Sequence, residues 1–360
     1  MIENWDLLID RTDLSRTEVL ALPAPDTVVP ADGEVLLEME RFALTANNIT
    51  YGVYGDRLGY WQFFPAEGNW GRIPVWGFAT VRQSAVETIP VGTRLFGYLP
   101  MATHWVTRLE RRPWGVVDVS AHRAALPSAY NSLVEAAPGP LDDQIALLRP
   151  LFLTAFLLDD YFAAHADFGA TTFILSSASS KTALGLAWLL ARRGVRVIGL
   201  TSPRNTGFVE GVGYYAETRT YEAFSQTPVE GQAVFVDFAG APEVVAAVHH
   251  SLGDQLVHSA VVGSTHQAGG AVGPGRLPGP RPTFFFAPEQ LRQRSKDWGG
   301  EVLNSRIQAA LEGFITDNGW LEVSTHAGPE ALKAIYQTVL AGTARPEEGH
   351  MVRSKAAAGG

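Results

Sequence analysis

Serine hydroxyls and one lysine gather in the turn SSASSKTA (176–183), which follows an apolar run. A turn between a strand and a helix can bind phosphate, because unpaired N–H groups at the start of the helix point outward. The dinucleotide fingerprint would place glycines in this turn, and alanine is accepted at its last position, here Ala183. We therefore weigh a serine-rich phosphate site against a serine-capped helix without a ligand. The candidate phosphate ligands are Ser177, Ser179, Ser180, Lys181 and Thr182.

The elements on either side of this turn are predicted to be strand, helix and strand. TTFILSS (171–177) is apolar and β-branched, residues 181–193 carry apolar side chains at helical spacing, and VRVIGL (195–200) is a second short apolar run. Three such elements within about 30 residues form a βαβ unit, so the two strands should be parallel neighbours with a right-handed crossover.

The residues after the second strand indicate which cofactor would fit. An acidic side chain there would bind the ribose 2′-hydroxyl of NAD, but TSPRN (201–205) contains no carboxylate. A guanidinium forks onto phosphate oxygens, so Arg204 and Ser202, with Asn205 beside them, fit a 2′-phosphate. This favours NADP(H), and a solvated surface charge is the alternative for Arg204.

Composition bounds the function. The chain has 360 residues, a net charge of −9, 46% apolar and 18% charged residues, and no cysteine. The acidic balance favours neither nucleic acid nor an anionic membrane as a partner, and a thiolate zinc site is excluded. No signal peptide or long apolar segment is recognised, so we expect a soluble, cytoplasmic protein.

Along the chain, the pattern is β-rich, then alternating, then helical. Residues 1–125 read as short strands punctuated by Gly and Pro, and 140–165 carry apolar residues at helical intervals. The aromatic-rich segment NNITYGVYGDRLGYWQFFP (47–65) reads as a loop that packs internally or lines an apolar pocket. After the βαβ unit come two further buried strands and a Gly/Pro-rich loop, and two helical segments, 289–316 and 328–342, close the chain. This order predicts a β-domain beside a doubly wound parallel sheet.

Several motifs resemble those of one superfamily in order and spacing. They include GEVLLEMERFALTANNITYGVY, IPVGTRLFGY, FLTAF (152–156), LTSPRN, GVGYY and VFVDFAG. Over residues 30–345 the chain resembles the medium-chain dehydrogenase/reductase superfamily, in its zinc-independent branch of quinone oxidoreductases and enoyl-thioester reductases. NNITY, HRAALPSAYN (122–131), the serine-rich turn and FFAP are similar to an uncharacterised subfamily within it. Thr50 stands where that superfamily commonly has Asp, and the set of zinc ligands is missing.

This resemblance implies an α/β fold with two domains. We expect a GroES-like β-barrel domain from 1–139 and 289–350, a Rossmann doubly wound parallel-sheet domain from 140–288 that binds NADP(H), and a disordered tail, 351–360.

The resemblance also implies roles for individual residues. Tyr51 and Tyr54 would donate a hydrogen bond or a proton, and Asn48 would orient a carbonyl. Each of the three has an alternative role in barrel packing. His266 is a candidate proton donor, although a lone histidine is more often structural. Two residues would touch the cofactor itself, one beside the adenine ribose and one beside the nicotinamide: Tyr221 and Thr154.

The expected activity is NADPH-dependent, metal-independent hydride transfer to an activated double bond or carbonyl of a small apolar substrate, such as an enone, an enoyl thioester or a quinone. The alternative is a nucleotide-binding sensor or scaffold with the reductase fold and no redox turnover, which the glycine-free turn favours. A homodimer is expected by analogy, and neither nucleic acid nor a membrane is expected as a partner.

Overall fold

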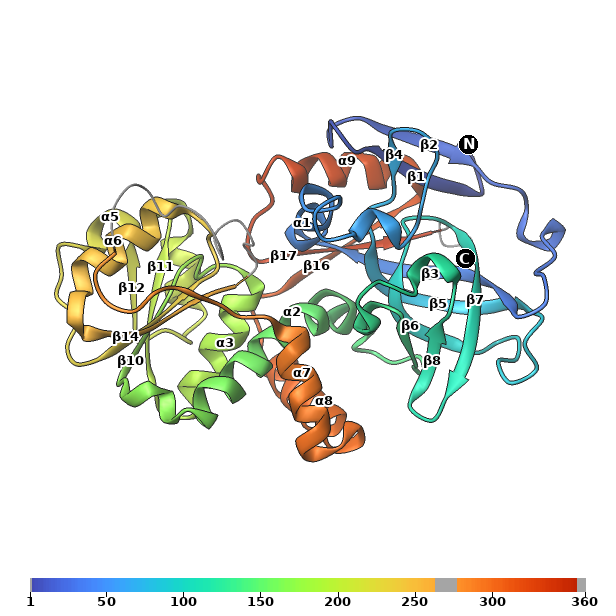
Figure 1. Ribbon diagram of the computed structural model, residues 1–360. Coiled ribbons are helices and arrows are strands. Elements are labelled where there is room, and N and C mark those ends of the chain that lie inside the picture. The colour runs from blue at the N-terminus through green and yellow to red at the C-terminus, as the bar shows by residue number, and fades with distance from the viewer. Residues whose placement is uncertain (1, 263–276, 355–360) are drawn as a thin grey trace. The chain divides into compact units, whose positions relative to one another are not determined.

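The computed structural model describes residues 2–262 and 277–354, and these form two compact units (Figure 1). Unit 1 comprises Met1–Leu147 and Leu321–Gly360, and unit 2 comprises Leu148–Trp320. The sequence predicted a first domain boundary at 139/140, which lies 8 residues before the start of unit 2 at 147/148 (147 − 139). It predicted a second boundary at 288/289, which lies 32 residues before the end of unit 2 at 320/321 (320 − 288). Those boundaries stay a prediction.

Unit 1 is built on a closed, antiparallel barrel of six strands. The order is β3-β5-β6-β9-β8-β7, and β7 pairs back onto β3, which closes the sheet. The strands are β3 (Glu34–Leu44), β5 (Val75–Ser84), β6 (Arg94–Leu99), β7 (His104–Arg112), β8 (Gly115–Asp118) and β9 (Ser132–Glu135).

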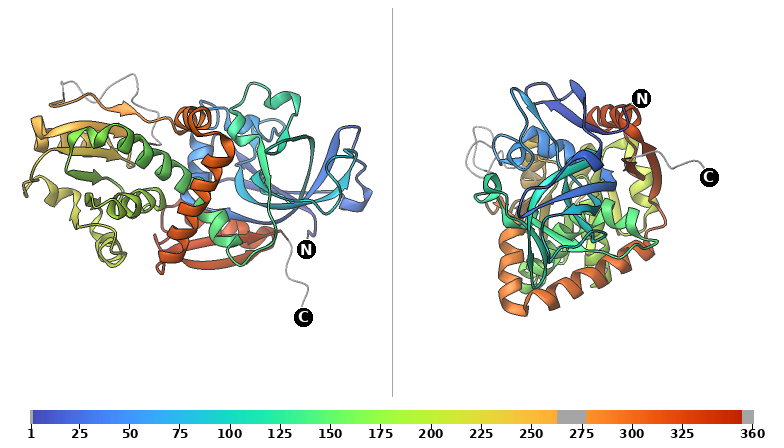
Figure 2. Two further views of the ribbon diagram at one scale, coloured as in Figure 1. Left: turned by 90° about the horizontal axis from the view of Figure 1, so that it is seen from below. Right: turned by 90° about the vertical axis from the view of Figure 1, so that its right-hand side faces the viewer.

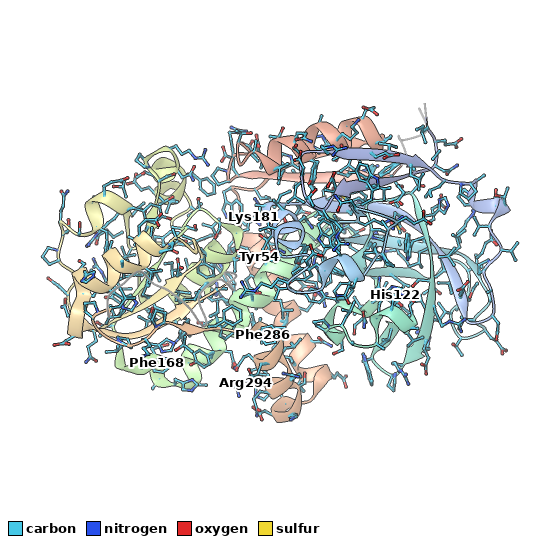
Figure 3. All side chains as sticks on the ribbon, turned by 45° about the horizontal axis from the view of Figure 1, so that its top comes forward. Tyr54, His122, Phe168, Lys181, Phe286 and Arg294 are labelled. Atoms are coloured by element: carbon cyan, nitrogen blue, oxygen red, sulfur yellow. The ribbon has the colours of Figure 1, made fainter. Side chains whose placement is uncertain are left out.

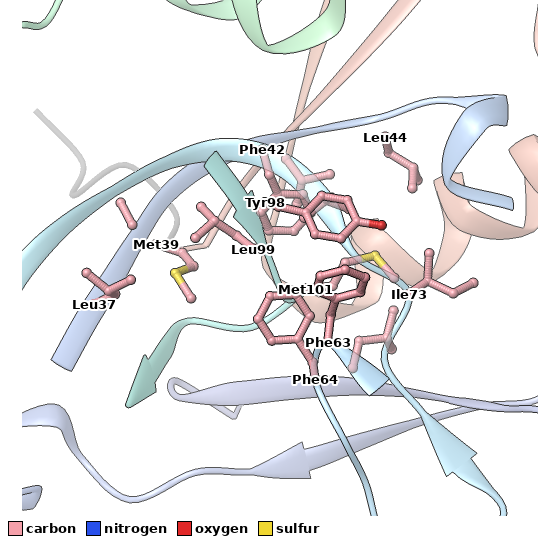
Figure 4. Packing of buried hydrophobic residues seen from close by; sticks show 14 of the residues in the cluster. Leu37, Met39, Phe42, Leu44, Phe63, Phe64, Ile73, Tyr98, Leu99 and Met101 are labelled. Carbon is pink, nitrogen blue, oxygen red and sulfur yellow. The ribbon is translucent and has the colours of Figure 1, made fainter. Parts of the chain in front are cut away.

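Alternating apolar residues explain why these strands close around a core. Val35, Leu37 and Met39, at alternate positions of β3, belong to one buried core cluster, and Leu36 is buried outside that cluster. Aromatic rings fill the centre, where Phe63 and Tyr98 meet edge to face with ring centroids 5.3 Å apart. Figure 4 shows this packing around Met101 and Phe64. The barrel is therefore a filled core and not a channel.

Two further strand groups complete unit 1. β17 (Glu348–Arg353) pairs antiparallel with β3, and β16 (Glu322–Ala327) pairs parallel with β17. A separate small sheet consists of β2 (Thr17–Ala21), β1 (Trp5–Asp10) and β4 (Trp70–Gly71). Residues 351–353, expected in the tail, thus form the end of β17, because pairing with β3 buries Met351 and Val352.

Two helices cover parts of unit 1. α9 (Gly328–Leu340) lies beside the N-terminal strands, and the Tyr336 hydroxyl donates to the Leu14 carbonyl at 2.8 Å (Figures 1 and 2). α1 (Ala46–Val53) contains the first residues of the aromatic-rich segment, which was expected to be a loop. That expectation was wrong for 47–53, because a capping box at Thr45 begins a helix there.

Unit 2 is a parallel six-stranded sheet with the order β12-β11-β10-β13-β14-β15. Numbered along the chain, this is the 3-2-1-4-5-6 order of the doubly wound dinucleotide-binding fold. The strands are β10 (Thr172–Leu175), β11 (Arg196–Thr201), β12 (Glu217–Thr220), β13 (Ala233–Asp237), β14 (Leu256–Val261) and β15 (Thr283–Phe284).

Buried apolar runs explain this sheet. β10 and β13 are buried at every position, as strands covered on both faces should be. The helices are α2 (Asp142–Ala164), α3 (Lys181–Arg192), α4 (Thr206–Gly211), α5 (Tyr221–Phe224), α6 (Pro242–Leu252), α7 (Ala287–Trp298) and α8 (Gly300–Asp317). α2 begins in the sequence of unit 1 and continues in that of unit 2.

The predicted fold class is confirmed: a GroES-like barrel and a Rossmann sheet both occur in the chain. Within 2–262 and 277–354, none of the helices has both the length and the apolar character needed to cross a bilayer.

Candidate functional site

The serine-rich turn lies at the carboxyl end of β10, between β10 and α3. β10 and β13 are neighbours in the middle of the sheet. After β10 the chain continues to β11 on one side, and after β13 it continues to β14 on the other. The strand order therefore reverses between β10 and β13, and folds of this kind bind their ligands at this switch point. Ser180 is the N-cap of α3, and its hydroxyl accepts the Ala183 N–H at 3.3 Å. Lys181, labelled in Figure 3, is the first residue of α3 and so follows the carboxyl end of β10.

The backbone of the turn adopts a conformation that favours glycine. Ser177 has φ +46°, in the left-handed region, one residue before Ala178, which holds the first glycine position of the fingerprint. The cost of placing a side chain there is about 1–2 kcal/mol. Serine therefore retains the backbone geometry of a glycine turn, and nearby hydrogen bonds hold it in place.

Two hydrogen bonds join the turn to residues that follow the neighbouring strands β12 and β11. The Tyr221 hydroxyl, which follows β12, accepts the Ser177 N–H at 2.9 Å. The Asn205 side-chain amide, which follows β11, donates to the Ser179 hydroxyl at 3.0 Å. The structure thus brings together four residues that were predicted separately as cofactor ligands.

These contacts leave donors for an anion. Tyr221 and Ser179 each use a lone pair to accept an N–H, so each hydroxyl keeps its own proton to donate. The Lys181 ammonium lies 5.9 Å from the centre of the Trp320 ring and adds positive charge at the start of α3. Hydroxyl donors, an ammonium and a helix N-terminus are what a phosphate requires.

The turn is tied to β13 by a pair that the sequence analysis missed. The Ser176 hydroxyl donates to the Asp237 carboxylate at 2.7 Å and accepts the N–H groups of Phe238 and Ala239 at 2.8 and 3.0 Å. Burial raises the pKa of Asp237, and the bonds from Ser176 and the backbone oppose this rise. The strand β13 ends at this aspartate, and an acidic residue closing a buried strand was the available signal.

The remaining predicted cofactor residues also lie in unit 2. Arg204 is exposed, Thr182 is half-buried in the first turn of α3, and Thr154 is half-buried in α2. The Ser202 carbonyl accepts the Asn205 N–H at 3.0 Å, so Ser202 begins the turn that carries Arg204. Their roles stay predictions.

In unit 1, Asn48 is engaged by its own helix. Its side-chain oxygen accepts the Thr45 N–H at 2.7 Å, and its amide donates to the Pro74 carbonyl at 2.8 Å. Asn48 is also buried. The geometry favours the alternative of an amide satisfied in the barrel, and a role in orienting a carbonyl stays a prediction.

Tyr51 has a polarised hydroxyl. Its oxygen accepts the Asn47 side-chain amide at 2.7 Å and the Trp76 indole N–H at 3.2 Å, so its proton is left to donate. Burial raises the pKa of Tyr51, and these two bonds counter part of that rise. Tyr51 also belongs to a tyrosine cluster, since its ring centre lies 4.7 Å from that of Tyr60 and 5.4 Å from that of Tyr98.

Two predicted residues complete the account. Tyr54 is the half-buried C-cap of α1 and is labelled in Figure 3. His266 lies outside the described residues.

Comparison with solved structures identifies the class of fold. Over 98% of this chain and 99% of theirs, it is similar to CurA from Vibrio vulnificus in complex with NADPH and to a putative NADPH:quinone reductase from Mesorhizobium loti, each with 14% identity and a TM-score of 0.63. It is also similar to a mutant form of enoyl thioester reductase from Candida tropicalis, with 13% identity over 98% and 100% of the chains and a TM-score of 0.59. The resemblance to medium-chain reductases is confirmed as one of fold.

A family model also matches most of the chain. Residues 42–345 match the family described as "Protein of unknown function (DUF2855)", and the chain belongs to this family. Among curated proteins, none matches the sequence.

Proposed function

We propose that this protein is an NADPH-dependent reductase that needs no metal for its chemistry and transfers hydride to an activated double bond or carbonyl. The observation that carries the proposal is the convergence of the ends of β10, β11 and β12 on the serine-rich turn through the Ser177–Tyr221 and Ser179–Asn205 hydrogen bonds. The fold that it shares with proteins described as an NADPH complex, a quinone reductase and an enoyl thioester reductase supports it.

The residues of the turn fit the phosphates of NADP(H). Ser179 and Tyr221 would donate O–H groups to phosphate oxygens, and Lys181 would neutralise part of their charge. The bound nicotinamide supplies the hydride. The substrate takes up that hydride and one proton, which leaves NADP⁺ and the reduced substrate. In unit 1, Tyr51 would donate a hydrogen bond to the oxygen on which negative charge develops.

NADPH binding and turnover are tested separately. NADPH is titrated against the tryptophan fluorescence of the full chain, and its oxidation is then followed at saturating NADPH with enones, enoyl thioesters and quinones. Saturable binding with oxidation by a member of this panel is expected. Tight binding without turnover would instead support the sensor, and absence of binding would overturn both functions.

Arg204 tests the choice of cofactor. Arg204→Asp should weaken NADPH binding at least about tenfold and leave NADH binding nearly unchanged, because a charge-assisted bond to the 2′-phosphate contributes roughly 1.5–3 kcal/mol. Arg281→Asp is the matched control, since Arg281 is also an exposed arginine of unit 2. Equal losses for the two nucleotides would show that Arg204 does not read the 2′-phosphate.

A homodimer, tested by light scattering, is part of the proposal.

A further inference from the structure

Two histidines and a serine converge between β16 and β17, at the edge of the large sheet in unit 1. The two strands run side by side in Figure 1, and Ser324 lies directly opposite His350 in their register. Ser324 and His326 are two residues apart on β16, so their side chains share one face with His350. This face therefore gathers three side chains that can donate lone pairs.

The donor atoms of these side chains form a small triangle. His326 Nε2 lies 3.4 Å from His350 Nδ1, and the Ser324 hydroxyl oxygen lies 3.2 Å from the first nitrogen and 3.0 Å from the second. A tetrahedral ion with metal–nitrogen bonds of about 2.0–2.1 Å holds two ligands about 3.3–3.4 Å apart. The two imidazole nitrogens already have this separation.

A carboxylate lies behind one of the imidazoles. Glu348 Oε2 is 3.6 Å from His350 Nε2, the nitrogen on the opposite side of the ring from Ser324. Histidines that bind a metal through one nitrogen commonly direct the other toward a carboxylate, which fixes the ring and its tautomer. Glu348 lies at ion-pair distance from this nitrogen, and a small shift of its side chain would bring it into hydrogen-bond range when His350 binds an ion.

The surrounding charge favours a cation. Arg345 is in ion pairs with three carboxylates at once, those of Glu322, Glu347 and Glu348, at 3.1, 3.1 and 2.9 Å. Three carboxylates therefore share one guanidinium in this network, and Glu348 connects the network to His350. Ser324 is exposed and His326 half-buried, so an ion can enter from solvent and keep water as a further ligand.

From this geometry we propose that His326 Nε2, His350 Nδ1 and the Ser324 hydroxyl bind a divalent transition-metal ion of the zinc class. In the described part of the chain, no group of three or more histidine or carboxylate side chains could hold a metal ion. The third donor here is a hydroxyl, so the affinity should be below that of a structural site with four strong ligands. The site is independent of the proposed hydride transfer, which requires no metal.

The test uses the full chain, stripped with a chelator and dialysed. Zn²⁺ is titrated at about pH 7.5, where the ligands can lose their protons, in competition with a chromogenic zinc indicator. We expect about one equivalent bound, and an absorption band of tetrahedral Co²⁺ in the visible range when Co²⁺ replaces Zn²⁺. His326→Gln and Glu348→Gln should each lower the affinity about tenfold or more.

His122→Gln is the matched control, because His122 is an exposed histidine of unit 1 on another element. It should bind zinc as the unchanged protein does. His326 is only half-buried, so its variant should keep the fold, which thermal melting without metal checks. Absence of zinc binding, or equal affinity in His326→Gln and in the unchanged protein, would overturn the proposal and leave the triangle as a structural hydrogen-bond network.

Discussion

Removing one oxygen atom, by the change Tyr221→Phe, tests whether the serine-rich turn binds phosphate. The Tyr221 hydroxyl accepts the Ser177 N–H at 2.9 Å and has its own proton left to donate. The variant keeps the ring and loses both functions of the oxygen. Because the two functions act on different states of the protein, they can be measured separately.

The two losses differ in size. A neutral hydrogen bond contributes about 0.5–1.5 kcal/mol to folding, so the free energy of unfolding should fall by about 1 kcal/mol. A bond to a charged phosphate is worth about 1.5–3 kcal/mol, so NADPH affinity should fall roughly 10- to 150-fold. Denaturant unfolding without nucleotide measures the first loss, and fluorescence titration with NADPH measures the second.

Tyr215→Phe is the matched control at the same turn. The Tyr215 hydroxyl donates to the Ala178 carbonyl at 2.7 Å, so its proton is already used within the protein. This variant should lose comparable stability and keep most of its NADPH affinity. If both variants lose stability but neither loses affinity, Tyr221 serves only to hold the turn, and our assignment of the phosphate donors is refuted.

Two further predictions concern stability. Burial, with a smaller contribution from His165, lowers the pKa of His258 to about 4. Between about pH 6.5 and 4 the unfolded chain therefore takes up a proton on this histidine and the folded chain does not. Because the side chain is partly exposed, the free energy of unfolding should fall by about 1–2 kcal/mol as the pH drops through this window. Denaturant unfolding across this range should show a smaller fall for His258→Gln, and an unchanged slope would refute the assignment. Gly71→Ala would place a Cβ 2.5 Å from the buried Trp61 ring and should lower the free energy of unfolding by about 1–3 kcal/mol, measured by thermal or denaturant unfolding. Gly207→Ala is the control and should not lower it, because no packed neighbour lies within 4 Å of the added Cβ. Equal effects of the two changes would contradict this packing argument.

The Rossmann unit was predictable because its signals are local. Buried runs such as that of β13, and the helical spacing in α3, fix element type without knowledge of partners. The order of these elements then leaves few topologies, since parallel crossovers are right-handed. The expected helix over 181–193 and the observed α3, which ends at Arg192, differ by one residue.

The parts that could not be predicted depend on distant partners. β16 and β17 are paired with each other across 26 residues, and β17 is paired with β3 across about 300, so neither strand carries a strong local pattern. The helix α1 was missed because aromatic residues hid its capping box, in which Asn48 binds back to the N-cap. The contacts of Ser177 with Tyr221 and of Ser176 with Asp237 join strand ends 44 and 61 residues apart, and no spacing rule connects them.

These contacts change how the missing glycines are interpreted. A serine in the left-handed region costs about 1–2 kcal/mol, and the bond from its N–H to Tyr221 returns a comparable amount. The turn is therefore held open at little net cost, although its outward N–H at Ser177 is no longer available to a ligand. The hydrogen-bond donors for a phosphate are instead the hydroxyls of Tyr221 and Ser179, because each accepts an N–H and keeps its own proton to donate. A glycine-free turn in this setting is compatible with phosphate binding through side chains, and affinity should depend on Tyr221 and Ser179 more than on the backbone.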